Sequence, residues 1–374
     1  MPDTKISKIL DSFIEEGIKM TPIGATLLGV PGFDDKLDDF SMVGQKAREE
    51  LTRKTLNEVK AESPENEYDR IAQAVATERL SSELRLAESH ESRALFNLIS
   101  SPVTSIRQVF EMMPKDKSDS AANAAKRLNA ISEALKGWCS TLETVAGEGR
   151  VNSTRQVLAT AGQLETFSKG AFQTVAKKFD QAGSNSELLQ AAKNAESACL
   201  ETANWLKNSY APKSDPKDGV GEERYKMWAR HFTGADLNLK DTYEWGIAQL
   251  DEINTRMKKA ADRLYPDATS LREVADRLDK DPRYTVEGEA ELLRKLKEFI
   301  EKAVERLDGK EFDIDPRIKN CEARLAPEEV KIYRDQVRRG FQPWEEKLLV
   351  GGISSQLGIT KLFQVITFKL QQQR

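Results

Sequence analysis

Residues 120–147 read SAANAAKRLNAISEALKGWCSTLETVAG, and this stretch decides the fold class. Its apolar positions recur at alternating steps of three and four residues: Ala121, Ala124, Leu128, Ile131, Leu135, Trp138, Leu142 and Val145. That spacing puts the apolar side chains on one face of a helix. Gly147 and Gly149 follow the last apolar position, where a helix ends most easily on a residue that tolerates positive φ. The stretch therefore predicts a long helix with one face in a core.

Two later segments repeat the same pattern. The first carries apolar residues at Tyr243, Ile247, Leu250, Ile253, Met257, Ala260 and Leu264. Asn238 and Asp241 are placed to favour its start, and Pro266 stops it. The second carries Leu292, Leu296, Phe299, Ala303 and Leu307. On its polar face we expect charge pairs from Glu291 to Lys295 and from Glu298 to Lys302, each worth only about 0.2 to 0.5 kcal/mol.

Strand signals are weak through residue 320, and no Gly-rich turn joins a strand-like run to a helix as a dinucleotide or P-loop unit would require. The chain therefore predicts an all-α fold, a multi-helix array of long antiparallel helices. Breaks between helices are expected where Pro, Gly, Asp and Ser collect, at residues 21–40, 114–120, 210–221 and 309–316.

Composition narrows the functional classes. The chain of 374 residues has 57 basic and 61 acidic residues, a net charge of −4, so it offers no global positive field for nucleic acid. Cys139, Cys199 and Cys321 are far apart and suggest neither a disulfide framework nor a thiolate zinc site. The N-terminus does not resemble a secretory signal, and no uncharged stretch reaches the roughly 18 apolar residues of a membrane span. We expect a cytoplasmic protein that binds neither nucleic acid nor membrane.

Short motifs at several of the breaks occur in the order of a known bacterial family. They are Thr21 to Gly29 (TPIGATLLG), Leu37 to Ser41 (LDDFS), Ser100-Ser101-Pro102, Arg127-Leu128, Gly219-Val220-Gly221 with Tyr225, Tyr243 to Gly246 (YEWG), Asp281 to Tyr284 (DPRY), Phe312 to Pro316 (FDIDP) and Cys321 to Pro327 (CEARLAP). Over roughly its first 328 residues, the chain resembles the bacterial family called domain of unknown function 885.

The resemblance implies a largely helical, zincin-like protein of a type thought to be a metal-dependent peptidase or amide hydrolase. Relatives carry a His-Glu-Gly-x-Pro-Gly-His-type segment in the C-terminal half. A helical His-Glu-x-x-His places two imidazoles on one face to hold zinc, while the Glu activates the bound water. This chain has only two histidines, and the position four after His90 is Ala94. No catalytic, cofactor-binding or metal-binding residue of the family is therefore carried over, and zinc is expected only in full-length relatives.

For both histidines a structural or surface role is favoured over zinc binding or catalysis. His90, followed by Glu91, is interpreted as a histidine on a helix surface rather than a zinc ligand. His231 lies in the segment Trp228-Ala229-Arg230-His231-Phe232, where packing or hydrogen bonding is favoured over catalysis.

The remaining conspicuous residues are interpreted in the same way. Asp34, Asp35, Asp38 and Asp39 lack the spacing of a calcium loop and are interpreted as a solvated acidic loop. Gly219-Val220-Gly221 is too short for a phosphate cradle and is interpreted as a loop that enters a helix. Core packing is favoured over a ligand groove for the tryptophans and for the stripe in residues 121–145. Ser and Cys nucleophiles have no recognisable histidine partner.

After Pro327 the sequence diverges from the family. We expect a helical domain over residues 1–328 and a divergent tail over residues 329–374. A frame displaced by one base across Arg334 to Arg338 can encode Gly-Pro-Ser-Glu, and across Trp344 to Leu348 it can encode Gly-Arg-Lys-Thr. Both resemble family segments that precede the zinc motif, so a frameshift is one hypothesis for the tail.

Three functional hypotheses follow from the sequence. In the first, the chain is the N-terminal helical portion of a metal-dependent peptidase or amide hydrolase, inactive alone because the zinc motif is missing. The second is a non-enzymatic helical binding or scaffold protein. The third is an enzyme that uses an unrecognised constellation, such as exposed carboxylates with His231. The residues identify no substrate or partner. We expect self-association through uncovered apolar faces, with the apolar, β-prone segment Leu348 to Phe368 contributing.

Overall fold

The computed structural model describes residues 4–94, 96–99, 101–180 and 183–323. These residues are mainly helical, and among them the only β-type pairings are two isolated bridges. The all-α, multi-helix prediction is confirmed. The chain divides into two compact units, Met1–Leu239 and Lys240–Arg374, and each is described by itself. The domain boundary expected at residues 328/329, the displaced-frame segments and Leu348 to Phe368 all lie outside the described residues.

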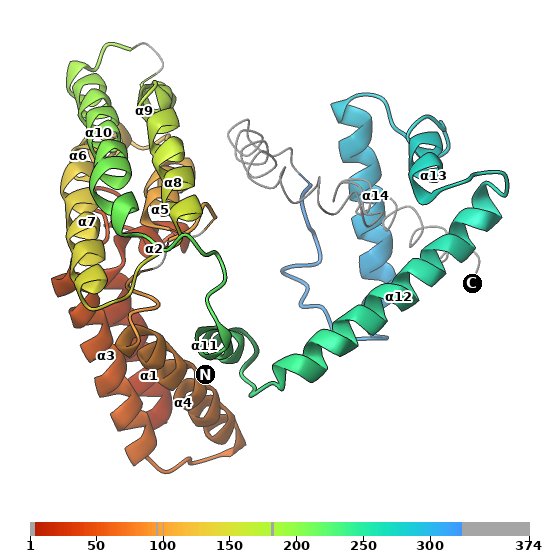
Figure 1. Cartoon of the computed structure of the whole chain (residues 1–374), viewed down its shortest axis with the longest axis horizontal. Helices are drawn as coiled ribbons and strands as arrows, with labels where there is room; N and C mark the ends of the chain where they lie inside the picture. Colours follow the sequence, from red (N-terminus) through yellow and green to blue (C-terminus); the bar gives the residue numbers. More distant parts are fainter. Residues whose placement is uncertain (1–3, 95, 100, 181–182, 324–374) are drawn as a thin grey trace. The chain divides into compact units, whose positions relative to one another are not determined.

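The described residues of the first unit form eleven α-helices in succession (Figure 1). They are α1 (Lys5–Met20), α2 (Pro22–Leu27), α3 (Met42–Ala61), α4 (Glu67–Glu88), α5 (Pro102–Met112), α6 (Ser120–Asn129), α7 (Ile131–Gly147), α8 (Thr154–Phe167), α9 (Ala171–Phe179), α10 (Ser186–Trp205) and α11 (Glu222–Thr233). After α10 the chain makes a π-helical turn (Leu206–Tyr210) and a 3-10 turn (Ala211–Lys213).

Side-chain caps explain where many of these helices begin. Thr4, Ser41, Asn66, Ser101, Ser153 and Asn185 each accept a hydrogen bond from a backbone N–H in the first turn of the helix that follows. Such caps satisfy donors that have no partner within the helix. The starts of these helices are therefore set by local residues.

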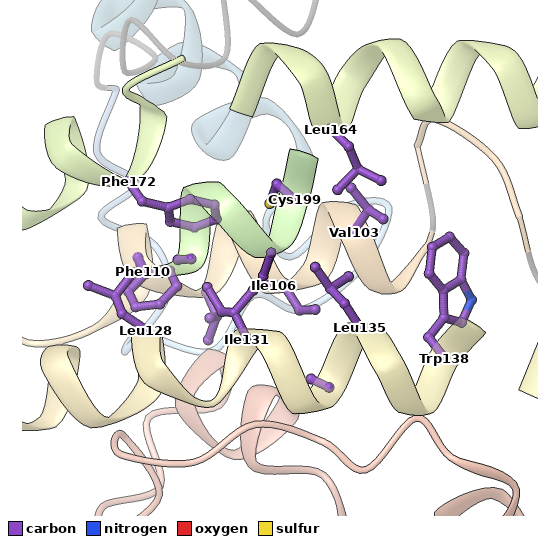
Figure 2. Packing of buried hydrophobic residues seen from close by; sticks show 14 of the residues in the cluster. Val103, Ile106, Phe110, Leu128, Ile131, Leu135, Trp138, Leu164, Phe172 and Cys199 are labelled. Atoms are coloured by element: carbon purple, nitrogen blue, oxygen red, sulfur yellow. The ribbon is translucent and has the colours of Figure 1, made fainter. Parts of the chain in front are cut away.

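A large apolar core lies among α5 to α10 (Figure 2). Phe110, Leu128, Ile131, Leu135 and Trp138 are all buried there. A smaller cluster, in which Leu56 and Val59 of α3 meet Leu80 and Leu84 of α4, joins these helices to α1. The predicted core stripe therefore lies in the main core from Ala124 to Leu142, while Ala121 is only partly buried and Val145 is buried outside this cluster.

The stripe is divided between two helices. α6 ends at Asn129 and α7 begins at Ile131, with Ala130 at φ −72° and ψ −13° between them. Leu128 and Ile131 remain buried on both sides of this junction. Because the apolar spacing continues across it, the pattern predicted one helix where the chain forms two.

The second unit holds α12 (Leu239–Leu264), α13 (Leu271–Leu278) and α14 (Glu289–Leu307). The two helices predicted here are confirmed. Their apolar cluster is small and consists of Met257, Ala261, Val274 and Leu278 with partly buried neighbours. The ion pairs of α14 differ from the predicted ones, because both Glu291 and Glu298 pair with Arg294, three or four positions away. Lys295 adds a smaller charge attraction to Glu291. In the described part of the chain, no helix has the length and apolarity needed to cross a membrane.

Candidate functional site: a buried carboxylate beside a small cavity

A fully enclosed glutamate lies just beyond the end of α4. The side chain of Glu91 accepts hydrogen bonds from Arg150 Nε at 2.9 Å and Arg150 Nη2 at 3.1 Å. It also accepts bonds from Arg224 Nε at 2.5 Å and Arg224 Nη2 at 3.3 Å. The indole Nε1 of Trp228 donates a further bond at 2.8 Å. Glu91 is only 2% exposed, so two guanidinium groups and one indole enclose a single carboxylate.

Local structure brings these groups together. α4 ends at Glu88, and His90 takes a left-handed conformation with φ 61° that turns the chain. Arg150 follows the end of α7, where its N–H donates to Val145 O at 2.9 Å. Arg224 and Trp228 are four positions apart on α11, so they lie on one face of that helix. Three separate helix ends or faces therefore meet at Glu91.

The surroundings keep Glu91 ionised. Burial alone would raise the pKa of this carboxyl, but the hydrogen bonds from Arg224, Trp228 and Arg150 outweigh burial and hold its pKa below the ordinary value. Since the carboxylate oxygens already accept five hydrogen bonds, Glu91 is poorly suited to act as a general base.

A cavity of about 180 Å³ opens beside this cluster. Its lining includes Glu91, Phe96, Arg150, Asn152, Gln156, Asp215, Lys217, Asp218, Gly219, Val220, Arg224 and Trp228. Gly221, at φ 80°, is the residue from which α11 begins, so the Gly219-Val220-Gly221 segment is a loop that enters a helix and also forms part of the cavity wall.

His90 lies in the turn after α4, so the interpretation of His90 as a helix-surface residue is wrong. Its ring Nε2 is 3.0 Å from Glu148 Oε2, and its Nδ1 is 2.9 Å from Arg93 Nη1. The helical geometry that His-Glu-x-x-His requires does not exist at residues 89–92, which form a turn.

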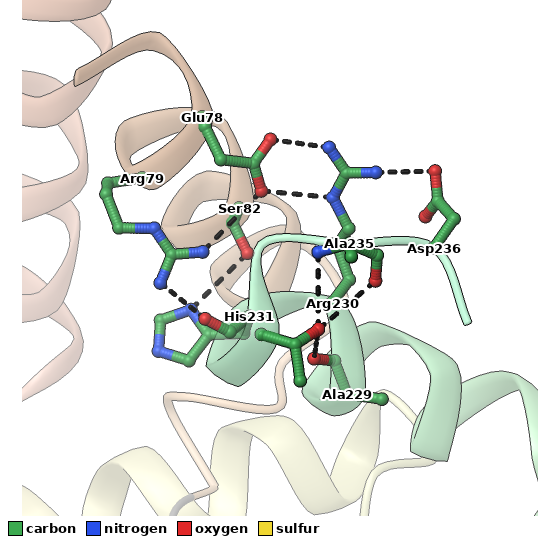
Figure 3. A network of polar contacts seen from close by, with 9 residues as sticks. Glu78, Arg79, Ser82, Ala229, Arg230, His231, Ala235 and Asp236 are labelled. Atoms are coloured by element: carbon green, nitrogen blue, oxygen red, sulfur yellow. Dashed lines mark hydrogen bonds and ion pairs between the residues drawn. The ribbon is translucent and has the colours of Figure 1, made fainter. Parts of the chain in front are cut away.

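His231 packs between α11 and α4 (Figure 3). Its Nδ1 is 3.4 Å from Ser82 Oγ, and its ring meets those of Trp228 and Phe232 edge to face. Its backbone carbonyl accepts a bond from Arg79. Burial, with a smaller contribution from the charge of Arg79, lowers the pKa of His231. The neighbouring Arg230 joins Glu78 at 2.6 Å, so this whole surface of α11 is held against α4.

The acidic loop encloses an arginine that sequence reasoning did not single out as a site residue. Arg127 is fully buried and donates to Lys36 O at 2.8 Å, Thr26 Oγ1 at 2.9 Å and Phe33 O at 2.6 Å. Burial lowers the pKa of Arg127 to about 10, and the charges of Asp34, Asp35 and Asp38 oppose that shift. These aspartates therefore offset a buried cation, a role that neither a calcium loop nor a solvated loop describes.

Asp38 and Asp39 also hold the loop to its neighbours. Asp38 Oδ1 accepts a bond from the N–H of Ile23 at 2.9 Å, and Asp39 Oδ1 accepts one from Ser41 N at 2.8 Å.

The thiols of buried Cys199 and partly buried Cys139 are poor nucleophiles. Burial raises the pKa of Cys139 and that of Cys199 to about 12. Within the described ranges, no three His, Cys, Asp or Glu side chains gather as they would around a metal ion.

Sequence reasoning singled out the residue pair His90-Glu91 but missed the partners of Glu91. Arg150 is 59 positions away and Arg224 is 133 positions away, so no local pattern joins them. The one local signal is the four-residue spacing of Arg224 and Trp228, beside the family motif residue Tyr225.

A family model described as "Bacterial protein of unknown function (DUF885)" matches residues 22–341. The chain belongs to this family. The match extends to residue 341, so it includes the first part of the tail that was expected to diverge from the family over residues 329–374. The predicted family is confirmed, while its link to zinc peptidases stays a prediction.

One solved structure carries the description "The structure of a putative lipoprotein of unknown function from Shewanella oneidensis". The similarity has a TM-score of 0.58 at 16% identity and covers 84% of this chain and 59% of that chain. This member of the family thus spans about three fifths of the length of that protein, and the likeness shows the fold alone. None of the curated proteins matches the chain.

Proposed function

We propose that this chain supplies the helical, non-catalytic part of a metal-dependent peptidase or amide-hydrolase type of protein, and that it does not hydrolyse peptides by itself. The proposal rests on the contacts that the side chains of His90 and Glu91 make. A zinc hydrolase of this type needs a free imidazole pair and a free glutamate. Here His90 contacts Arg93 and Glu148, and Glu91 accepts hydrogen bonds from two arginines and a tryptophan.

The second histidine does not supply the missing chemistry. His231 is held between Ser82 and two aromatic rings. It cannot join His90 in a His-Glu-x-x-His unit, because the two lie 141 positions apart in a sequence with only two histidines. These contacts support a structural role for both imidazoles.

The test is metal content and peptidase activity of the purified chain, measured with and without added zinc. A double variant, His90→Gln with His231→Gln, is the matched control. We expect less than about 0.1 zinc per chain and no hydrolysis above that of the control, because the chain lacks the imidazole pair of a catalytic zinc site. A true zinc site would bind about one zinc per chain. One zinc per chain, or hydrolysis that the double variant loses, would overturn the proposal.

A second candidate function is a non-enzymatic binding protein. The cavity beside Glu91 favours it, because polar and charged groups converge there on a space large enough for a small ligand. Pull-down of a specific partner by the folded chain, lost when the cavity is altered, would support this alternative; retention of that partner by the altered chain would oppose it.

A further inference from the structure

We propose that the cavity beside Glu91 binds a single carboxylate group, either of a small organic acid or at the end of a short peptide. The cavity lies between the turn that follows α4, residues 150–156 and the segment that enters α11. The proposal goes beyond the non-catalytic role above and requires neither metal nor hydrolysis.

The first argument is the balance of charge. Glu91 faces both Arg150 and Arg224, so one negative charge meets two positive charges. Asp218 is paired with Arg155 at 2.6 Å, and the charges of Asp215 and Lys217 cancel formally. The group therefore has one surplus positive charge beside a half-open cavity, where a counter-charge is favourable.

The second argument concerns the hydrogen-bond donors at the cavity that Glu91 and the backbone do not use. Arg150 uses Nε and Nη2 on Glu91 and Nη1 on the carbonyl of Val151. Arg224 uses only Nε and Nη2, so within the described residues its Nη1 is left for a ligand. Lys217 lines the same cavity, and its side chain makes no hydrogen bond or ion pair in the described part of the chain. Guanidinium and ammonium donors are the groups that bind carboxylates most strongly.

The third argument separates a carboxylate from a phosphate. A carboxylate carries one charge and matches the surplus, whereas a phosphate near pH 7 brings about 1.5 to 2 negative charges. The excess would face Glu91, Asp215 and Asp218. A volume of about 180 Å³ also suits a small acid or the last residue of a peptide.

Other groups in the lining suit the remainder of such a ligand. The carboxamide of Gln156 can bond an amide, and the rings of Phe96 and Trp228 provide apolar contact. Gln156 is partly exposed, so its carboxamide is accessible to a ligand.

The experiment is isothermal titration calorimetry of the full chain with five probes. They are acetate, N-acetyl-L-alanine, L-alanyl-L-alanine, N-acetyl-L-alanine methylamide and inorganic phosphate. We expect one equivalent of N-acetyl-L-alanine or of the dipeptide to bind. The uncharged methylamide should bind about tenfold more weakly or not at all, because it lacks the charge-assisted contacts.

The probes also separate the two sources of the carboxylate. Tighter binding of L-alanyl-L-alanine than of acetate and N-acetyl-L-alanine would assign the site to a peptide terminus. Tighter binding of acetate or N-acetyl-L-alanine than of the dipeptide would assign it to a small acid. Tighter binding of phosphate, equal binding of the methylamide, or binding of no probe would overturn the proposal.

The variants localise the site. Lys217→Gln changes an exposed side chain that makes no hydrogen bond or ion pair within the described residues, so the fold should persist, and we expect binding to weaken by about three- to tenfold. Lys226→Gln, also on an exposed lysine but outside the cavity lining, should leave binding within about twofold. Arg224→Gln should weaken binding by more than about tenfold, with circular dichroism checking its fold. Unchanged binding by Lys217→Gln would overturn the assignment even if Arg224→Gln fails to fold.

Discussion

The two units of the chain are built from equally regular helices but bury very different side chains. In the first unit, Phe110 and Trp138 are completely enclosed. In the second unit the described apolar cluster consists of Met257, Ala261, Val274 and Leu278, while Tyr243 and Trp245 on α12 are exposed over more than half of their surface. Helix signals in a sequence therefore do not reveal how much a helix packs. We infer that long-range packing stabilises the first unit, while local helix signals matter more in the second.

The sharpest test of this difference is one substitution made in both units. Phe110→Ala removes a ring that is 0% exposed in the core of the first unit, and Phe312→Ala removes one that is 56% exposed in the second. Phe110→Ala should reduce the free energy of unfolding by about 3 to 5 kcal/mol, because the ring leaves a cavity. Phe312→Ala should change it by about 0.5 kcal/mol or less. Urea unfolding followed by circular dichroism measures both, and equal losses would break the comparison.

The two units also differ in how deeply their Glu–Arg ion pairs are buried. Glu91→Gln leaves the guanidinium groups of Arg150 and Arg224 without their buried counter-charge, so we expect the first unit to lose about 3 kcal/mol. Glu291→Gln, on exposed α14, removes an ion pair with Arg294 and should have no measurable effect on stability. Thermal unfolding of the two variants checks this, and a destabilised Glu291→Gln would contradict it.

The loss from Glu91→Gln should depend on pH. Because the pKa of Glu91 in the folded chain is lowered, its charge stabilises the fold above the unfolded pKa of about 4.3. That stabilisation is lost as pH falls through the lower folded value. The difference in stability between wild type and Glu91→Gln should therefore be constant from about pH 6 to 7 and shrink below about pH 4. A difference that grows on acidification would show that the sign is wrong.

Replacing a helical glycine by alanine should change the free energy of unfolding by a smaller amount, and in opposite directions in the two units. A Cβ at Gly44 of α3 would lie 2.3 Å from the carbonyl oxygen of Asp39, so Gly44→Ala should cost about 1 to 3 kcal/mol. A Cβ at Gly246 of α12 would meet nothing within 4 Å, so Gly246→Ala should stabilise by about 0.5 to 1 kcal/mol. Denaturant midpoints of the two variants should therefore move in opposite directions; a stabilised Gly44→Ala would oppose this.

The same contrast explains what the sequence could predict. The presence of α12 and α14 follows from apolar spacing, and the ends of α12 follow from Asn238, Asp241 and Pro266, all of which act within a few residues. The division at Ala130 could not be predicted, because apolar spacing continues through it and the turn depends on packing around Leu128 and Ile131.

The candidate site was hidden for a similar reason. Glu91, Arg150 and Arg224 come from three distant segments, and each is an ordinary charged residue in its own neighbourhood. Arg127 was equally inconspicuous, although its contacts with residues 26–36 explain why the acidic loop folds against α6. The family motifs included Arg127 and the neighbour of Arg224, Tyr225, and the His90-Glu91 pair drew attention to Glu91, but none of these signals gave a physical role and none pointed to Arg150.

The weakest expected effect concerns the exposed face of α12. Ile247 and Leu250 are 45% and 39% exposed and lie on one side of the helix. We propose that this face promotes weak association between copies of the chain, because uncovered apolar side chains gain from leaving water. Sedimentation velocity across a range of concentrations should show a mass that rises with concentration, and Leu250→Ser should reduce that rise. Lys259→Ser is the matched control, since nine helical positions place Lys259 on the opposite side. If the wild-type chain stays monomeric throughout, or the two variants behave alike, the exposed face of α12 does not drive association, and the weaker packing of the second unit has no consequence between molecules.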